Sequence, residues 1–158
     1  AKDAAFDALI RQRFGPTHAA AARGELSSWR GTLEGRLAEI VVLDQLSRNM
    51  FRGEARAFAF DGMALVLAQE AVAAGAEALP VERRAFLYMP YMHSESKLIH
   101  AQALALFDQP GLERPLAFER AHEAIIARFG RYPHRNAVLG RASTPEELEF
   151  LAGPNASF

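Results

Sequence analysis

The sequence contains no cysteine, which excludes disulfides, thiolate nucleophiles and cysteine-ligated zinc sites. Lysine is scarce as well, because Lys2 and Lys97 are the only two and every other basic side chain is an arginine. The arginine bias has two interpretations. Arginine forks bind carboxylates and phosphates, whereas a GC-rich genome enriches both arginine and alanine. For the composition as a whole, the genomic explanation is favoured.

Two further absences narrow the functional classes. No apolar run approaches the roughly 20 residues that a membrane helix needs, and no signal-peptide pattern opens the chain. The formal net charge of −1 argues against a nucleic-acid or anionic-membrane surface. We therefore expect a cytoplasmic protein that binds neither nucleic acid nor membranes. Because the chain begins at Ala1 without methionine, we also expect that a leading segment is missing.

Signatures of well-known catalytic sites are absent too. The sequence has no G-x-S-x-G, no P-loop and no G-x-G-x-x-G. It also lacks H-E-x-x-H and the Glu-x-x-His pairs of di-iron proteins. His93 and Glu95 are two residues apart, which would place them on different faces of a helix. We expect neither a metal site nor a cofactor.

What is present predicts one all-α domain over residues 1–158. Half of the residues are hydrophobic, and no segment alternates with a period of two for long enough to form a sheet. We expect about seven to eight mostly antiparallel helices joined by short loops. They span Asp3–Phe14, a short alanine-rich segment from Thr17 to Gly24, Thr32–Met50, Ala55–Ala74, Pro80 to just before Pro90, Glu95–Phe107, Pro115–Phe129, and a last helix from Thr144 to Gly153.

Several helix ends have specific signals. Gly15-Pro16 predicts the end of the first helix, and Thr17 would cap the next. Gly130 is expected to stop the helix that precedes it. The last helix has the strongest start signal, because Thr144-Pro145-Glu146-Glu147 forms a capping box with proline at the first helical position.

The long helix over residues 32–50 carries polar side chains where apolar ones are expected. Asp44 lies on an apolar stripe, and Arg48 follows four residues later on the same face. Asn49 belongs to a second polar pair alongside, and Arg52 would continue the face. A buried carboxylate must be paired or hydrogen-bonded. The pair Asp44–Arg48 is therefore either a structural ion pair or part of a site, and the structural interpretation is favoured for the pair alone.

Two histidines also occupy unusual positions. His93 lies at a helix start beside Glu95, whose position in a first turn suits the helix dipole. His93 has no such explanation, so a general base, an anion ligand and a hydrogen-bonded core residue stay open. His122 lies on an apolar stripe between Phe118 and Ile125 and is better explained as a core residue.

The segment from Phe129 to Asn136 is the most unusual in the chain. It follows a helix stop and is dense in fixed donors, and Arg141 comes soon after it. Such a loop could cradle a carboxylate or phosphate, or its cations could cap helix C-termini. The number of donors favours a binding role. The residues concerned are Arg131, His134, Arg135, Asn136 and Arg141.

Four stretches of this sequence resemble one family, the bacterial proteins catalogued as domain of unknown function 924. They are residues 43–53 (LDQLSRNMFRG), residues 89–95 (MPYMHSE), residues 128–136 (RFGRYPHRN) and residues 139–148, which contain LGR and STPEEL. The resemblance implies an all-helical fold similar to the tetratricopeptide superfamily and no established reaction. Family members usually begin with an aromatic-rich segment ahead of Ala1. Its motifs fall on the following residues: Asp44, Arg48, Asn49, His93, Glu95, Arg131, His134, Arg135 and Asn136.

Three hypotheses follow. In the first, these residues with Arg52 and Arg141 form a polar pocket for a small anionic ligand. His93 or His134 would transfer protons, Asp44 or Glu95 would orient them, and whether the protein is an enzyme stays open. In the second, a curved helical surface binds a partner protein without catalysis. In the third, the polar cluster only pins the helix packing.

Overall fold

The computed structural model describes residues 3–154, which are helical and contain no β-strand. The all-α prediction is therefore confirmed. The α-helices are α1 Ala4–Ala22, α2 Leu33–Val41, α3 Ser47–Met50, α4 Asp61–Ala73, α5 Val81–Met92, α6 Lys97–Phe107, α7 Glu113–Phe129 and α8 Pro145–Leu151. Shorter helical turns are η1 Ser27–Gly31, η2 Val42–Leu46, η3 Ala55–Ala57, η4 Ala76–Ala78 and η5 Pro133–Arg135.

Helix α1 corrects the prediction that Gly15-Pro16 separates two helices. Pro16 lies inside one continuous helix, and Thr17 caps nothing. A proline inside a helix removes one backbone hydrogen bond and strains the preceding turn. The helix continues because Ile10 and His18, on either side of the proline, are both buried. Packing of this face against η2 and α3 outweighs the local preference for a break.

The long helix predicted over residues 32–50 is confirmed, with one irregularity. Thr32 caps it by accepting a hydrogen bond from the Gly35 backbone N–H. Between α2 and α3 the helix widens into the π-turn η2, which contains Asp44. Such π-turns are often found at functional sites. Asp44 is buried within this turn.

Helix boundaries in the middle of the chain differ from the prediction. Residues 55–57 form only a short turn, and α4 begins at Asp61. Val66 is exposed, and small residues such as Ala64 and Ala68 fill the buried face of α4. Helix α5 continues through Pro90 to Met92, because both residues are buried in the core. Helix α6 begins at Lys97, two residues later than predicted.

The C-terminal third follows its predicted capping signals. Gly130 ends α7 with a left-handed backbone, at φ 69°. Thr144 and Glu147 form both hydrogen bonds of the capping box that starts α8. The segment between α7 and α8 contains η5. The residues from Phe129 to Asn136, which the sequence shows to be dense in hydrogen-bond donors, lead into this segment, and we call them the donor-rich loop.

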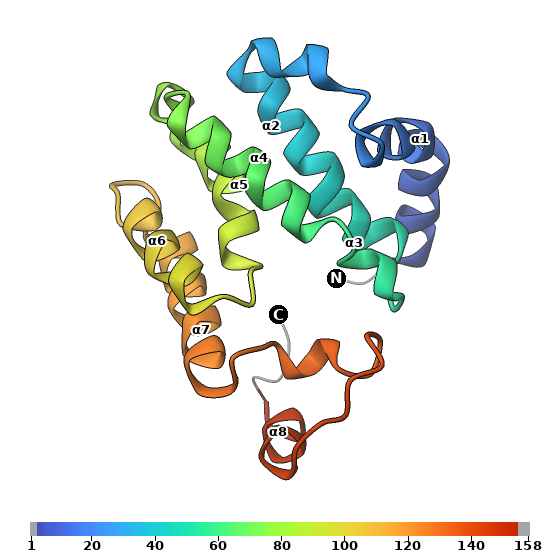
Figure 1. The fold of residues 1–158 in the computed structure, drawn as a ribbon, viewed down its shortest axis with the longest axis vertical. Helices are drawn as coiled ribbons and strands as arrows, with labels where there is room; N and C mark the ends of the chain where they lie inside the picture. Colours follow the sequence, from blue (N-terminus) through green and yellow to red (C-terminus); the bar gives the residue numbers. More distant parts are fainter. Residues whose placement is uncertain (1–2, 155–158) are drawn as a thin grey trace.

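The helices are arranged so that this C-terminal segment faces the ends of α3 and α5. Consecutive helices α4, α5, α6 and α7 pack side by side, and α2 packs on α4 and α5. Figure 1 shows them following one another in an arc, with the segment leading to α8 crossing the open side. The main core lies between α2, α4, α5 and α6 and includes Ile40, Leu43, Leu87 and Phe107. The tetratricopeptide-like arrangement implied by the resemblance stays a prediction.

Over residues 3–154, no helix is both long and apolar enough to cross a membrane.

Candidate functional site

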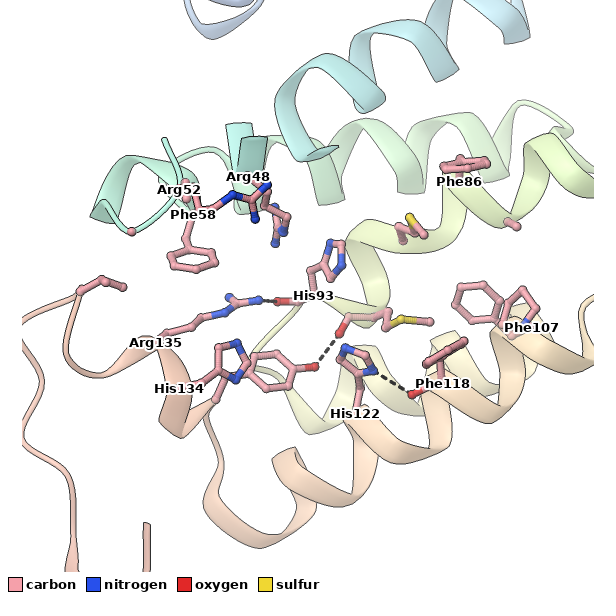
Figure 2. Close-up of a pocket in the computed structure, with 18 of the residues that line it drawn as sticks. Arg48, Arg52, Phe58, Phe86, His93, Phe107, Phe118, His122, His134 and Arg135 are labelled. Atoms are coloured by element: carbon pink, nitrogen blue, oxygen red, sulfur yellow. Dashed lines mark hydrogen bonds between the residues drawn. The ribbon is translucent and has the colours of Figure 1, made fainter. Parts of the chain in front are cut away.

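A cavity of about 740 Å³ lies where α3, α5, α7 and the C-terminal segment meet. Figure 2 shows its two ends: Phe86, Phe107 and Phe118 gather at one, and Arg48, Phe58, His134 and Arg135 at the other, with His93 and His122 between them. Five residues expected from the sequence to bind a ligand line this cavity, namely Arg48, Arg52, His93, His134 and Arg135.

An ion triad that was not predicted from the sequence fixes the side chains at the polar end of the cavity. Asp61, the first residue of α4, accepts two hydrogen bonds from Arg48, both at 2.9 Å. The same carboxylate accepts a third hydrogen bond from Nη1 of Arg135, at 3.1 Å. The Arg135 guanidinium is sandwiched between the rings of Phe58 and Tyr132, each with its centroid 4.5 Å away. Asp61 therefore fixes two arginines from distant segments on one wall.

Asp44 lies behind this wall and holds His93. Its Oδ1 is 2.7 Å from Nδ1 of His93 and 3.1 Å from Nη1 of Arg48. Burial alone would raise the pKa of Asp44, but the charges of His93 and Arg48 outweigh this effect and hold it at about 2. Burial and the charge of Arg48 lower the pKa of His93, against the opposing effect of Asp44. The Asp44 side chain is only 1% exposed, so it reaches a ligand only through its neighbours.

Two other histidines flank the cavity. Burial lowers the pKa of His134 to about 4, and Arg135 adds to the shift. Burial also lowers the pKa of His122 to about 4, although its Nδ1 donates to the Phe118 carbonyl oxygen at 2.7 Å. Both imidazoles are therefore neutral near pH 7. Within residues 3–154, the buried Nδ1 of His134 and Nε of Arg135 have no hydrogen-bond partner.

The remainder of the cavity wall is mostly apolar, with Arg114 beside Phe118 as a charged exception. Aromatic rings and thioethers from α5, α6 and α7 form it: Phe86, Met89, Met92, Phe107 and Phe118. Phe86 and Phe118 remain 49% and 46% exposed, which is unusual for phenylalanine. Their exposed area adjoins the cavity, so this end offers apolar surface to a ligand.

We call the six residues at the polar end the cavity cluster: Asp44, Arg48, Asp61, His93, His134 and Arg135.

Four other predicted residues belong to a second network, away from the larger cavity. Arg141 binds Glu95 through two hydrogen bonds of 2.6 and 2.9 Å, and Glu95 also accepts from the Tyr132 backbone N–H. Arg141 donates further to the side-chain oxygen of Asn136 and to the Tyr132 carbonyl. These bonds fasten the C-terminal segment to the turn between α5 and α6.

The same network reaches α8 through Glu147. Arg131 binds this carboxylate with two hydrogen bonds of 2.6 and 2.8 Å, and Asn136 donates to it at 3.2 Å. Arg131, the Thr144 backbone and Asn136 together lower the pKa of Glu147 to about 2, against the opposing effect of burial. We call this second group the C-terminal clamp, and its members are Glu95, Arg131, Asn136, Arg141 and Glu147.

Asn49 and Arg52 bind the N-terminal helix. Both donate to Asp7 of α1, at 2.8 Å from Asn49 and at 2.6 and 3.0 Å from Arg52. These bonds lower the pKa of Asp7 to about 2. Arg52 also lines the cavity and Asn49 does not. Gln45, which precedes Asn49 by four residues and forms the polar pair with it in the sequence, donates to Asp44. The two side chains of this pair therefore have different partners.

Three contributors to the site were not predicted from the sequence. Asp61 has a simple local explanation as an acid in a first helical turn, and its partners lie 13 and 74 residues away in sequence. Tyr132 was treated only as part of the donor-rich loop. His122 was assigned to the core, and it is buried as expected, but it also lines the cavity. In the described part of the chain, no group of three or more His, Asp or Glu side chains is placed to hold a metal ion.

Comparison with known proteins identifies the family. No curated protein matches the sequence significantly. A solved structure of a protein of unknown function from Agrobacterium tumefaciens is 41% identical, with a TM-score of 0.91 over 96% of this chain and 86% of that one. Residues 1–155 match the family described as bacterial protein of unknown function (DUF924). The chain belongs to this family.

Proposed function

We propose that the protein binds a small carboxylate with an apolar body in the 740 Å³ cavity. The observation that carries this proposal is the separation of the cavity into an aromatic end and an end lined by arginine and histidine (Figure 2). Cavities of about 300–1,000 Å³ with mostly apolar walls and a few convergent polar groups are typical of small-molecule sites. The apolar body would lie against Phe86, Phe107 and Phe118, and the carboxylate would face the cavity cluster.

The charges of the cavity cluster limit how strongly the head group contributes. Arg48 and Arg135 carry two positive charges, and Asp44 and Asp61 carry two negative ones close by. A ligand carboxylate would therefore bind to arginines whose positive charge is already balanced by Asp44 and Asp61. Most of the binding free energy must then come from the apolar end, while the polar end selects the head group. This proposal narrows the sequence-based hypothesis of a polar pocket for a small anionic ligand to a ligand that also has an apolar body.

A homologous series of linear carboxylates tests the proposal. Affinity measured by titration calorimetry should rise from acetate to decanoate, by about fourfold for each added methylene, because one buried methylene contributes about 0.8 kcal/mol. Octanoate should also bind more tightly than octylamine, because the N–H groups of Arg48 and Arg135 can donate to a carboxylate but offer an ammonium group no acceptor. Affinity that does not depend on chain length contradicts the proposal.

A pair of matched variants locates the binding. Phe118 lines the cavity and Leu98 lies on α6 outside it, and both are partly exposed. Phe118→Asp should abolish the octanoate signal, and Leu98→Asp should leave it unchanged. Equal loss in both variants would place octanoate outside the cavity.

The sequence-based alternative of a protein-interaction module stays a prediction. Among the described residues, the large hydrophobic side chains that remain exposed come from six different helices, with Phe86 and Phe118 at the cavity and the others elsewhere. No specific partner follows from that distribution.

A further inference from the structure

His93 is held in the orientation of a general base. A carboxylate only accepts hydrogen bonds, so Nδ1 of His93 carries the proton that is shared with Asp44 at 2.7 Å. In the neutral imidazole, Nε2 then carries the lone pair. No hydrogen bond to Nε2 is found among residues 3–154. The free lone pair therefore belongs to a ring that lines the cavity.

The backbone and the partners of His93 leave it little freedom. Its carbonyl accepts from Nη2 of Arg135 at 3.0 Å, and its N–H donates to the Met89 carbonyl at 3.0 Å. Asp44 is fixed in turn by Gln45 and Arg48. A base that is fixed in this way needs no reorganisation when it accepts a proton.

Charged groups around His93 come from several packed elements. Asp44 and Arg48 face it from the long helix, Asp61 from α4, and His122 from α7 with ring centroids 6.5 Å apart. Arg135 contacts its carbonyl. Burial and Arg48 lower its pKa, so the ring is in its basic form near pH 7.

His93 also lies at the junction of two cavities. A second cavity of about 270 Å³ is lined by Asp61, Ser94 and Glu95 together with apolar side chains such as Leu65 and Leu139. His93 and Arg135 line both cavities. His93 therefore borders both cavities, and the larger one offers space beside it for an apolar substrate.

We propose that the protein hydrolyses carboxylic esters with an apolar acyl group, with His93 as the general base and Asp44 as its positioning residue. This inference rests on the proposed function, because the apolar cavity must hold the acyl chain. Nε2 of His93 would take a proton from water as the water oxygen forms a bond to the ester carbonyl carbon. The carbonyl oxygen becomes an oxyanion near Arg48 and Arg135. When the oxyanion collapses, the bond to the leaving oxygen breaks and that oxygen takes the proton from His93. The products are a carboxylic acid and an alcohol.

The test uses 4-nitrophenyl octanoate and 4-nitrophenyl acetate with the full chain. Wild type should hydrolyse the octanoate ester with the higher kcat/KM. His93→Gln should lower this value by at least about 100-fold, the usual size of a general-base contribution. His93→Ala should regain activity when imidazole is added, because the added base replaces the missing ring.

Asp44→Asn tests the positioning role. Without the negative charge, His93 becomes a weaker base and its pKa falls, so the acidic limb of the pH–rate profile should move to lower pH. A merely structural role would lower the rate without moving this limb. Calorimetry with octanoate, run in parallel, shows whether each variant keeps the folded cavity.

The outcomes separate the two proposals. Octanoate binding without any ester turnover would overturn the hydrolytic inference and leave the proposed function intact. Turnover that persists in His93→Gln would also overturn it, because catalysis would then come from another surface group. Failure of octanoate to bind wild type would contradict the proposed function itself.

Discussion

The cavity cluster and the C-terminal clamp are built from the same kinds of residue but differ in what they leave unpaired. Each joins arginines to carboxylates from distant parts of the chain, over sequence separations of 13 to 74 residues. In the clamp, Glu95 and Glu147 each accept several hydrogen bonds. In the cavity cluster, buried nitrogen atoms of His134 and Arg135 have no partner among the residues described.

One dense polar segment of the sequence therefore contributes to two different networks within a few residues. Arg131 and Arg135 are four residues apart, yet Arg131 fastens α8 and Arg135 lines the cavity. Buried polar groups without partners reduce stability, and native proteins keep few of them. Their presence beside a cavity supports our proposal that the cavity cluster binds a ligand, whereas the hydrogen bonds of the clamp are explained by stability alone.

The largest expected effect is on the ion triad. Asp61→Ala removes the carboxylate between Arg48 and Arg135, and the free energy of unfolding should fall by about 3 kcal/mol, since breaking a buried ion pair leaves an uncompensated charge. Urea denaturation measures this loss. Glu34→Ala, at an exposed 3.8 Å contact with Arg83, is the control and should change stability by less than about 1 kcal/mol. Similar losses in both variants would show that the triad contributes no more than a surface pair.

The next prediction uses pH to separate the histidines at the cavity from the clamp carboxylate Glu147. His122 and His134 have folded-state pKa values of about 4, below the ordinary 6.5, so the unfolded chain binds more protons between these values. Stability should therefore fall as pH drops from 6.5 to 4. The clamp carboxylate Glu147, with a pKa of about 2 against 4.5, should lose its contribution only as pH drops from 4.5 toward 2.

Two variants assign the two pH windows to His134 and Glu147. His134→Asn should flatten the stability curve between pH 6.5 and 4, measured by urea denaturation at each pH. The stability difference between wild type and Glu147→Gln should be constant above pH 5 and shrink below 4.5. A His134→Asn curve that keeps the full wild-type slope would contradict the assignment of that histidine.

A smaller effect is expected at the cap of α8. Thr144→Ala removes the hydrogen bond to the Glu147 backbone N–H and should lower the free energy of unfolding by about 1 kcal/mol. Thr144→Ser keeps the hydroxyl and should restore most of this loss. Octanoate affinity should be unchanged in both variants. A loss of affinity in Thr144→Ala would show that the clamp and the cavity are coupled.

Much of the fold could be predicted because its signals are local. The capping box at Thr144, the glycine stop at Gly130 and the long helix that places Asp44 four residues before Arg48 all depend on neighbours in sequence. The breaks predicted at Pro16 and Pro90 were wrong because burial of the flanking residues comes from tertiary packing. Local preference cannot show that packing.

The candidate site was predictable only in part. Unexplained polar residues pointed to Asp44, Arg48, His93 and the donor-rich loop, and the structure brings these segments together. Glu95 and Arg131 do not line the larger cavity, because those side chains pair with Arg141 and Glu147. The aromatic wall of the cavity could not be predicted from the sequence, since the same apolar pattern is found on an ordinary buried helix face.

The most direct test compares octanoate binding in His134→Leu with that in Arg131→Gln. Both side chains lie in the donor-rich loop, but only His134 lines the cavity, and its buried Nδ1 has no partner within residues 3–154. Calorimetry should show roughly tenfold weaker binding in His134→Leu, which loses the equivalent of one hydrogen bond to a charged group, and binding within about twofold of wild type in Arg131→Gln. Equal weakening in both variants, or weakening only in Arg131→Gln, would contradict the division into a binding cluster and a structural clamp.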